Sequence, residues 1–97
     1  MPKKQREKRY RQLWPLLSQY TLDHINGGEK NRSASELAEM YSEIYKEQIG
    51  VAAIAGMLRV LKQHGYANSE DRYIADRYNV TLWWRLAGKD IEQFLRC

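Results

Sequence analysis

The sequence has a single cysteine, no long apolar run and no visible secretion signal. Its single cysteine, Cys97, excludes an internal disulfide and fits a reducing compartment. No apolar run approaches the length that crosses a bilayer, and the basic start MPKKQREKRY has no apolar segment after it. We therefore expect no membrane partner and a cytoplasmic protein, associated with the nucleoid if it binds DNA, or nuclear in a eukaryote.

Residue patterns typical of catalysis are also missing. His24 and His64 stand apart from any cysteine, histidine or carboxylate at metal-ligand spacing. The chain has no glycine-rich phosphate loop, and no serine or cysteine has an identifiable base beside it. The sequence predicts a protein that is not an enzyme, with no catalytic residues, no metal site and no cofactor.

The positive charge is concentrated at the start of a chain that is otherwise ordinary in composition. Its 97 residues, 43% hydrophobic and 29% charged, fit one small globular domain. We divide it into a basic N-terminal arm, residues 1–12, and a domain over residues 13–97. The arm holds one acid, Glu7, and six basic residues: Lys3, Lys4, Arg6, Lys8, Arg9 and Arg11. Such an arm favours polyanions through counterion release, and a solvated tail that keeps the protein soluble is the alternative.

The first predicted helix lies next to the arm. Its apolar residues fall near helical spacing and precede a glycine pair: Leu13, Leu16, Leu17, Tyr20 and Ile25, then Gly27 and Gly28. Pro15 leaves two possibilities open. The helix starts at the proline, or a basic helical extension from about Arg6 is kinked there.

Two further helices follow. Ser33 with Glu36 is a capping box that starts the second, whose expected buried stripe is Leu37, Met40, Tyr41 and Ile44. Acidic residues form another stripe on that helix: Glu36, Glu39, Glu43 and Glu47. The third helix, in GVAAIAGMLRVLKQHG, has one apolar arc and ends at Gly65; the arc comprises Val51, Ile54, Met57, Leu58 and Leu61.

After Gly65 the pattern changes to strands. We expect strands at about 66–69 and 80–87, with a charged loop between them that carries Asp71, Arg72, Asp76 and Arg77. Trp83 and Trp84 are adjacent on a strand, so one should be in the core and the other on an outer face. A short helix containing Ile91, Phe94 and Leu95 closes the chain.

The order of these elements and two segments, ASELAEMY and AAIAGMLRVLKQHGY, carry a family resemblance. Ile54, Leu58, Leu61 and Gly65 match the spacing of the third helix of winged helix-turn-helix domains. Over roughly residues 13–95 the chain therefore resembles that superfamily, which implies a mostly α fold with a small β-hairpin. One departure is the long connection 42–50, so the second helix is expected to run on to about Lys46.

The resemblance implies a DNA-binding surface. In DNA-binding members the third helix enters the major groove and the loop between the strands touches the backbone. Carried over by position, the residues facing the groove are Ala52, Ala53, Gly56, Arg59 and Gln63. We add Lys62, the wing arginines Arg72 and Arg77, and the six basic residues of the arm as candidate DNA contacts. The expected function is that of a double-stranded DNA-binding transcriptional regulator or accessory factor, acting as a homodimer.

The third helix leaves other roles open. Its first two turns have no side chain that can read a base edge by hydrogen bonding. Ala52, Gly56 and an exposed Val60 would suit close approach of a second copy or another protein, as in a winged-helix adaptor or dimerisation module. The same surface could instead be buried inside the domain, for example beneath Trp14 or Pro15.

Overall fold

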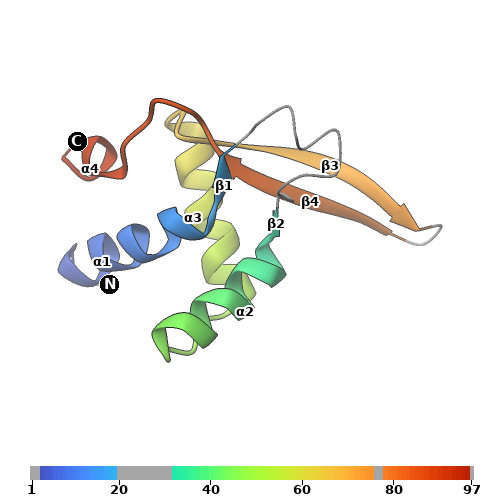
Figure 1. Ribbon diagram of the computed structural model, residues 1–97, viewed down its shortest axis with the longest axis horizontal. Helices are drawn as coiled ribbons and strands as arrows, with labels where there is room; N and C mark the ends of the chain where they lie inside the picture. The colour runs from blue at the N-terminus through green and yellow to red at the C-terminus, as the bar shows by residue number, and fades with distance from the viewer. Residues whose placement is uncertain (1–2, 20–31, 76–77, 97) are drawn as a thin grey trace.

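The helices lie at one end of a long β-hairpin, which belongs to a small sheet (Figure 1). The computed structural model describes residues 3–19, 32–75 and 78–96 (Figure 1). In chain order the elements are α1 (Lys3–Leu13), a 3-10 helix η1 (Trp14–Leu16), β1 (Ser18–Gln19), β2 (Arg32–Ser33), α2 (Ala34–Tyr45), α3 (Val51–Gln63), β3 (Ala67–Ala75), β4 (Tyr78–Arg85) and α4 (Ile91–Leu95). The expected class, mostly helical with a small β component, is confirmed.

Pro15 ends the first helix. The basic segment is itself helical, α1 stops at Leu13, and η1 carries Pro15 in its first turn. Leu17 then has extended backbone angles, φ −76° and ψ 131°, and leads into β1. The predicted basic helical extension before Pro15 is therefore confirmed. The alternative, a helix that starts at Pro15 and continues, is wrong, because residues 17–19 are extended. Proline has no N–H to donate to the carbonyl four residues earlier, and its ring crowds that carbonyl, which explains why the α-helix does not continue through Pro15. Tyr20, His24, Ile25, Gly27 and Gly28 lie outside the described residues.

Helix α2 begins where the capping box predicts. The Ser33 hydroxyl accepts a hydrogen bond from the Glu36 backbone N–H at 3.2 Å. The helix ends at Tyr45, followed by Lys46 in the left-handed region with φ 55°. Leu37 and Tyr41 are fully buried, but the expected burial of Ile44 is wrong, because 54% of it is exposed. Ile44 belongs to the last turn, at the end of α2 that projects beyond the other helices (Figure 1).

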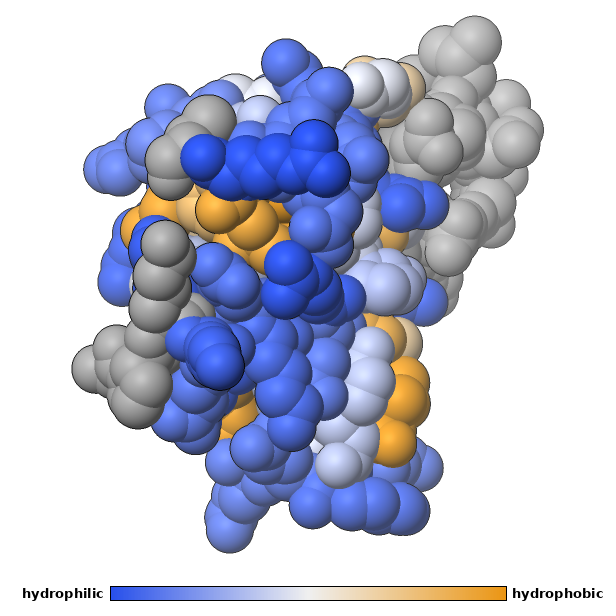
Figure 2. Space-filling model, turned by 90° about the vertical axis from the view of Figure 1, so that its left-hand side faces the viewer, coloured by the Kyte–Doolittle hydropathy of each residue, from blue (hydrophilic) through white to orange (hydrophobic). Residues whose placement is uncertain are grey.

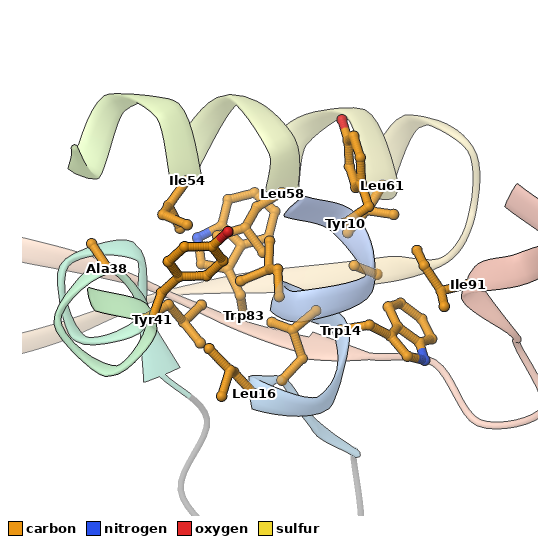
Figure 3. Close-up of a cluster of buried hydrophobic side chains, with 14 of the residues drawn as sticks. Tyr10, Trp14, Leu16, Ala38, Tyr41, Ile54, Leu58, Leu61, Trp83 and Ile91 are labelled. Carbon is orange, nitrogen blue, oxygen red and sulfur yellow. The ribbon is translucent and has the colours of Figure 1, made fainter. Parts of the chain in front are cut away.

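Helix α3 supplies the centre of the core. Ile54, Leu58 and Leu61 are fully buried and point from α3 into the cluster shown in Figure 3. Val51, in the first turn, is 47% exposed, contrary to expectation, because it precedes the part of the helix that the core covers. Gly65 has φ +80° and ends the helix as predicted: its N–H donates to the Lys62 carbonyl, and the Tyr66 N–H donates to the Leu61 carbonyl at 2.8 Å.

The sheet is built around β4. Strand β3 pairs with β4 antiparallel from Ala67 opposite Arg85 to Ala75 opposite Tyr78, with a register shift between Tyr73 and Ala75. On the other edge, β2 pairs antiparallel at Leu82 and Trp83, and β1 pairs parallel at Trp84 and Arg85. The predicted strand at 66–69 is too short, because β3 continues to Ala75 and carries Asp71 and Arg72, which we expected in a loop. The two-residue strands β1 and β2 have no sequence pattern of their own, since their hydrogen bonding depends on β4.

Both adjacent tryptophans are buried, at 7% exposure for Trp83 and 8% for Trp84. Trp83 belongs to the cluster under α3 (Figure 3). Trp84 lines a groove of about 600 Å³ together with Asn68, Leu86 and Ala87. Trp84 is not part of that cluster, so the two rings point to different faces of the strand as predicted, although the outer ring is also buried.

Tyr41 anchors α2 to α1 and should make stability depend on alkaline pH. Its hydroxyl donates to the Gln12 Oε1, and burial together with the nearby Glu47 carboxylate raises the pKa of Tyr41 to about 12. A tyrosine in the unfolded chain loses its proton near pH 10, so the native state binds the proton more tightly. The stabilisation is complete below about pH 10 and is lost as the pH rises towards about 12.

Urea unfolding at a series of alkaline pH values measures this loss. Tyr41→Phe removes the titrating group, so we expect the variant to lose less stability than the wild type over that pH window. Parallel decline of the two proteins would show that another group is responsible.

Candidate nucleic-acid interface

The outer face of α3 is made of small residues followed by polar ones. Ala52, Ala53, Arg59 and Gln63 are exposed, and Gly56 is half-buried. Val60 is not the exposed valine that the sequence suggested: it is half-buried and packs against the core. Ala52, Gly56 and Val60 were expected to form an apolar patch for a partner protein. Because Val60 packs against the core, this patch is smaller than expected.

A basic groove runs beside this face, where three elements meet. Its volume is about 540 Å³, and it is lined by Ser33, Ala34 and Ser35 at the start of α2, by Ala55, Arg59 and Lys62 of α3, and by Val80, Thr81 and Trp83 of β4. The lining contains two cations and three hydroxyl groups, and no carboxylate belongs to it. We call this surface the basic groove; it is suited to an anion.

The two cations of the basic groove are held differently. The Lys62 ammonium donates to the Ser69 hydroxyl at 2.8 Å and lies 5.9 Å from the centre of the Trp83 ring. These contacts hold the lysine against β3 and β4. Arg59 is exposed and has no hydrogen bond or ion pair with the residues that the structure describes. Its guanidinium is the donor available for a ligand.

The N-terminus of α2 adds a weaker positive field to the basic groove. Backbone N–H groups of the first helical turn point out of a helix N-terminus, which favours anions there. Ser33 uses its hydroxyl to cap the helix, while Ser35 is exposed beside it. Carboxylates do lie near the rim: Glu36 follows in the same turn, and Asp71 accepts a hydrogen bond from Thr81 at 2.7 Å.

A second groove, which meets the basic groove at Ser35, has the opposite charge. Its volume is about 810 Å³, and Glu39 and Glu43 line it together with Ser42, Ile49 and Val51. No basic side chain belongs to its lining. Two residues of the acidic stripe predicted on the second helix, Glu39 and Glu43, thus lie in a groove that adjoins the basic groove at Ser35, and a polyanion is favoured in the basic groove but not in this second one.

The basic residues of the arm lie elsewhere. Lys4, Arg6 and Lys8 are exposed on α1, whereas Arg11 is tied to Glu92 of α4 at 2.7 Å and to Glu7 at 3.8 Å. Helix α1 and the far end of the β3–β4 hairpin lie at opposite ends of the molecule (Figure 1). Figure 2 views the end with α1 and α4, which is largely hydrophilic. No described residue of the arm belongs to the lining of the basic groove.

The structure describes only some of the remaining residues that were predicted to contact DNA. Arg72 is in β3, paired through its backbone with Val80, and Arg77 lies outside the described residues, as does the side chain of Lys3. The sequence reading missed Ser33, Ser35, Thr81 and Trp83 as groove residues. The capping box marked the start of α2, but only the pairing of β2 with β4 places that start beside α3.

Gly56 has no structural need to be glycine. It lies inside α3, its φ is not positive, and a Cβ there would meet nothing within 4 Å among the described residues. Gly56→Ala should therefore raise the free energy of unfolding by about 0.5–1 kcal/mol through helix propensity, measurable by urea titration. The matched control is Gly65→Ala, which should destabilise because Gly65 has φ +80°. A loss of stability in Gly56→Ala would reveal crowding at this face.

Neither the described part of the structure nor the comparison with known proteins points to a second kind of site. Over the described ranges there is no cluster of histidine, cysteine and acidic residues that could hold a metal ion, and no helix long and apolar enough to cross a bilayer. Comparison with protein-family models, curated proteins and solved structures gave no match. The local chemistry of the basic groove is therefore what any functional proposal rests on.

Proposed function

We propose that this chain is a winged-helix protein that binds double-stranded DNA in a regulatory or accessory role. In this proposal α3 lies against the major groove, the β3–β4 hairpin acts as the wing, and the basic groove receives the sugar-phosphate backbone. The observation that carries it is the basic groove: Arg59 and Lys62 face the start of α2 and strand β4 with no carboxylate in the lining.

The chemistry of the groove favours phosphate over other partners. Arginine and lysine donors combined with hydroxyl groups are typical contacts to phosphate oxygens. The basic groove also contains an exposed guanidinium, that of Arg59, which suits a polyanion. Base reading is left to few side chains, because Ala52, Ala53 and Gly56 cannot form side-chain hydrogen bonds to base edges.

A protein-binding role for α3 remains the second candidate. Gly56 has open space above it and Val51 is 47% exposed, so a partner helix could approach closely. Gly56→Leu distinguishes the two roles. If α3 is an interface between copies, the solution mass should fall to that of a monomer; if it serves DNA alone, the mass should not change and duplex affinity should decrease.

Salt titration of duplex binding tests the proposal. With a fluorescent duplex of about 20 bp, we expect binding at about 50 mM salt and a steep fall in affinity with rising salt, by about 0.9 logarithmic units per decade for each phosphate contacted. Absence of binding at low salt, or affinity that does not change with salt, would reject DNA as the partner.

A further inference from the structure

We infer that Ser69 is a positioning residue for phosphate binding, which does not touch the DNA but holds Lys62 in place for it. This inference rests on the proposed function, because it takes the basic groove as the site of the sugar-phosphate backbone. Lys62 belongs to the lining of the basic groove and Ser69 does not. The hydroxyl of Ser69 therefore acts on a ligand through the lysine.

Lys62 reaches from α3 to one cross-strand pair of the hairpin. Ser69 of β3 lies directly opposite Trp83 of β4. Directly opposed residues of an antiparallel pair have their side chains on the same face of the sheet. The Lys62 Nζ donates to the Ser69 Oγ at 2.8 Å and lies 5.9 Å from the centre of the Trp83 ring. One ammonium is thus held by a hydroxyl oxygen from one strand and by an aromatic ring from the next.

The two strands and the helix that carry these groups are fixed relative to one another. Trp83 is only 7% exposed and belongs to the hydrophobic core. Gly65, with φ +80°, turns the chain from α3 into β3, and backbone hydrogen bonds close this turn. Lys62 precedes the turn and Ser69 follows it, so their separation is set by the fold.

The contact with Ser69 leaves Lys62 able to bind a ligand. An ammonium has three N–H donors, and the bond to Ser69 uses one of them. A long lysine side chain loses rotamer freedom when a ligand fixes it. Because Ser69 already restrains Lys62, less of this freedom remains to be lost when a phosphate binds, and the affinity for phosphate is higher.

Arg59 provides a comparison within the same groove. It is exposed, and it has no hydrogen bond or ion pair with any residue that the structure describes. Its contribution to binding should therefore not depend on Ser69. Loss of one hydroxyl group should weaken the contribution of Lys62 and leave that of Arg59 unchanged.

Ser69→Val and Ser69→Thr test the role of the hydroxyl group, because valine and threonine are both β-branched and suit a strand. With the full chain and the fluorescent duplex of the salt titration, Ser69→Val should weaken binding by about two- to tenfold, the usual effect of losing one hydrogen bond. Ser69→Thr should bind as wild type does. The salt dependence of Ser69→Val should not change, since no charge is removed, whereas Lys62→Gln should make it shallower by about 0.9 logarithmic units per decade.

A double-mutant cycle assigns the effect to Lys62. Ser69→Val should have almost no further effect on affinity when Lys62→Gln is already present, because a positioning residue acts only through the group that it positions. It should keep its full effect when Arg59→Gln is present. Urea unfolding checks that each variant remains folded.

The inference is overturned if Ser69→Val binds the duplex as tightly as wild type, or if Ser69→Thr loses as much affinity as Ser69→Val. It is also overturned if Ser69→Val weakens binding equally in the presence of Lys62→Gln, because Ser69 would then act independently of the lysine. The proposed function fails by a different result, the absence of duplex binding by the wild-type protein at low salt, and the inference then falls with it.

Discussion

Replacing Arg59 and Lys62 together with glutamine is expected to weaken binding of a duplex by on the order of 10- to 100-fold at about 0.1 M salt. Both side chains line the basic groove, where Arg59 is unpaired within the described structure and Lys62 is oriented by Ser69 and Trp83. Removing two phosphate contacts should also make the salt dependence shallower by about 1.8 logarithmic units per decade. Fluorescence anisotropy over a range of salt concentrations measures both quantities.

The matched control for this variant is Lys46→Gln with Lys89→Gln, which removes two exposed charges that do not line the groove. Its affinity should decrease far less than that of the groove variant. Urea unfolding should show that both proteins remain folded, since all four side chains are exposed. Equal losses in the two variants would mean that net charge, and not the basic groove, determines binding.

Leu58→Ala is expected to lower the free energy of unfolding by about 2–5 kcal/mol. Leu58 is fully buried at the centre of α3, and it lies in one cluster with Tyr41 of α2 and Trp83 of β4. The truncation removes apolar contacts and leaves a cavity among elements that are held in place by other contacts. Domains of this size have only about 5–15 kcal/mol of stability, so the loss is a large fraction of the total.

Denaturant unfolding of wild type and variant measures this effect. Val51→Ala is the control on the same helix, because Val51 is 47% exposed, and it should change stability by less than about 0.5 kcal/mol. A small effect of Leu58→Ala, similar to that of the control, would show that α3 is not packed at the centre of the core. The same variant should reduce DNA binding only to the extent that it unfolds the protein.

Much of the fold is encoded in local patterns. Ser33 and Glu36 mark the start of α2, and Gly65 marks the end of α3, because each satisfies backbone groups within a few residues. The arc of Ile54, Leu58 and Leu61 is buried as its helical spacing predicts. Helical spacing wrongly predicted that Ile44 and Val51 are buried. Both lie near helix ends, where burial depends on how far the neighbouring elements extend.

The division of charge between two surfaces could not be derived from spacing. The sequence by itself determined that positive charge gathers before Leu13, that α3 has an apolar inner arc, and that Arg59 and Lys62 lie outside that arc. Only the tertiary structure decided that the start of α2 and strand β4 join them in one groove, and that Lys4 and Lys8 are exposed on α1 outside that groove. The reason is that helix periodicity and caps act within a few residues, whereas strand pairing and core packing bring together residues separated by most of the chain.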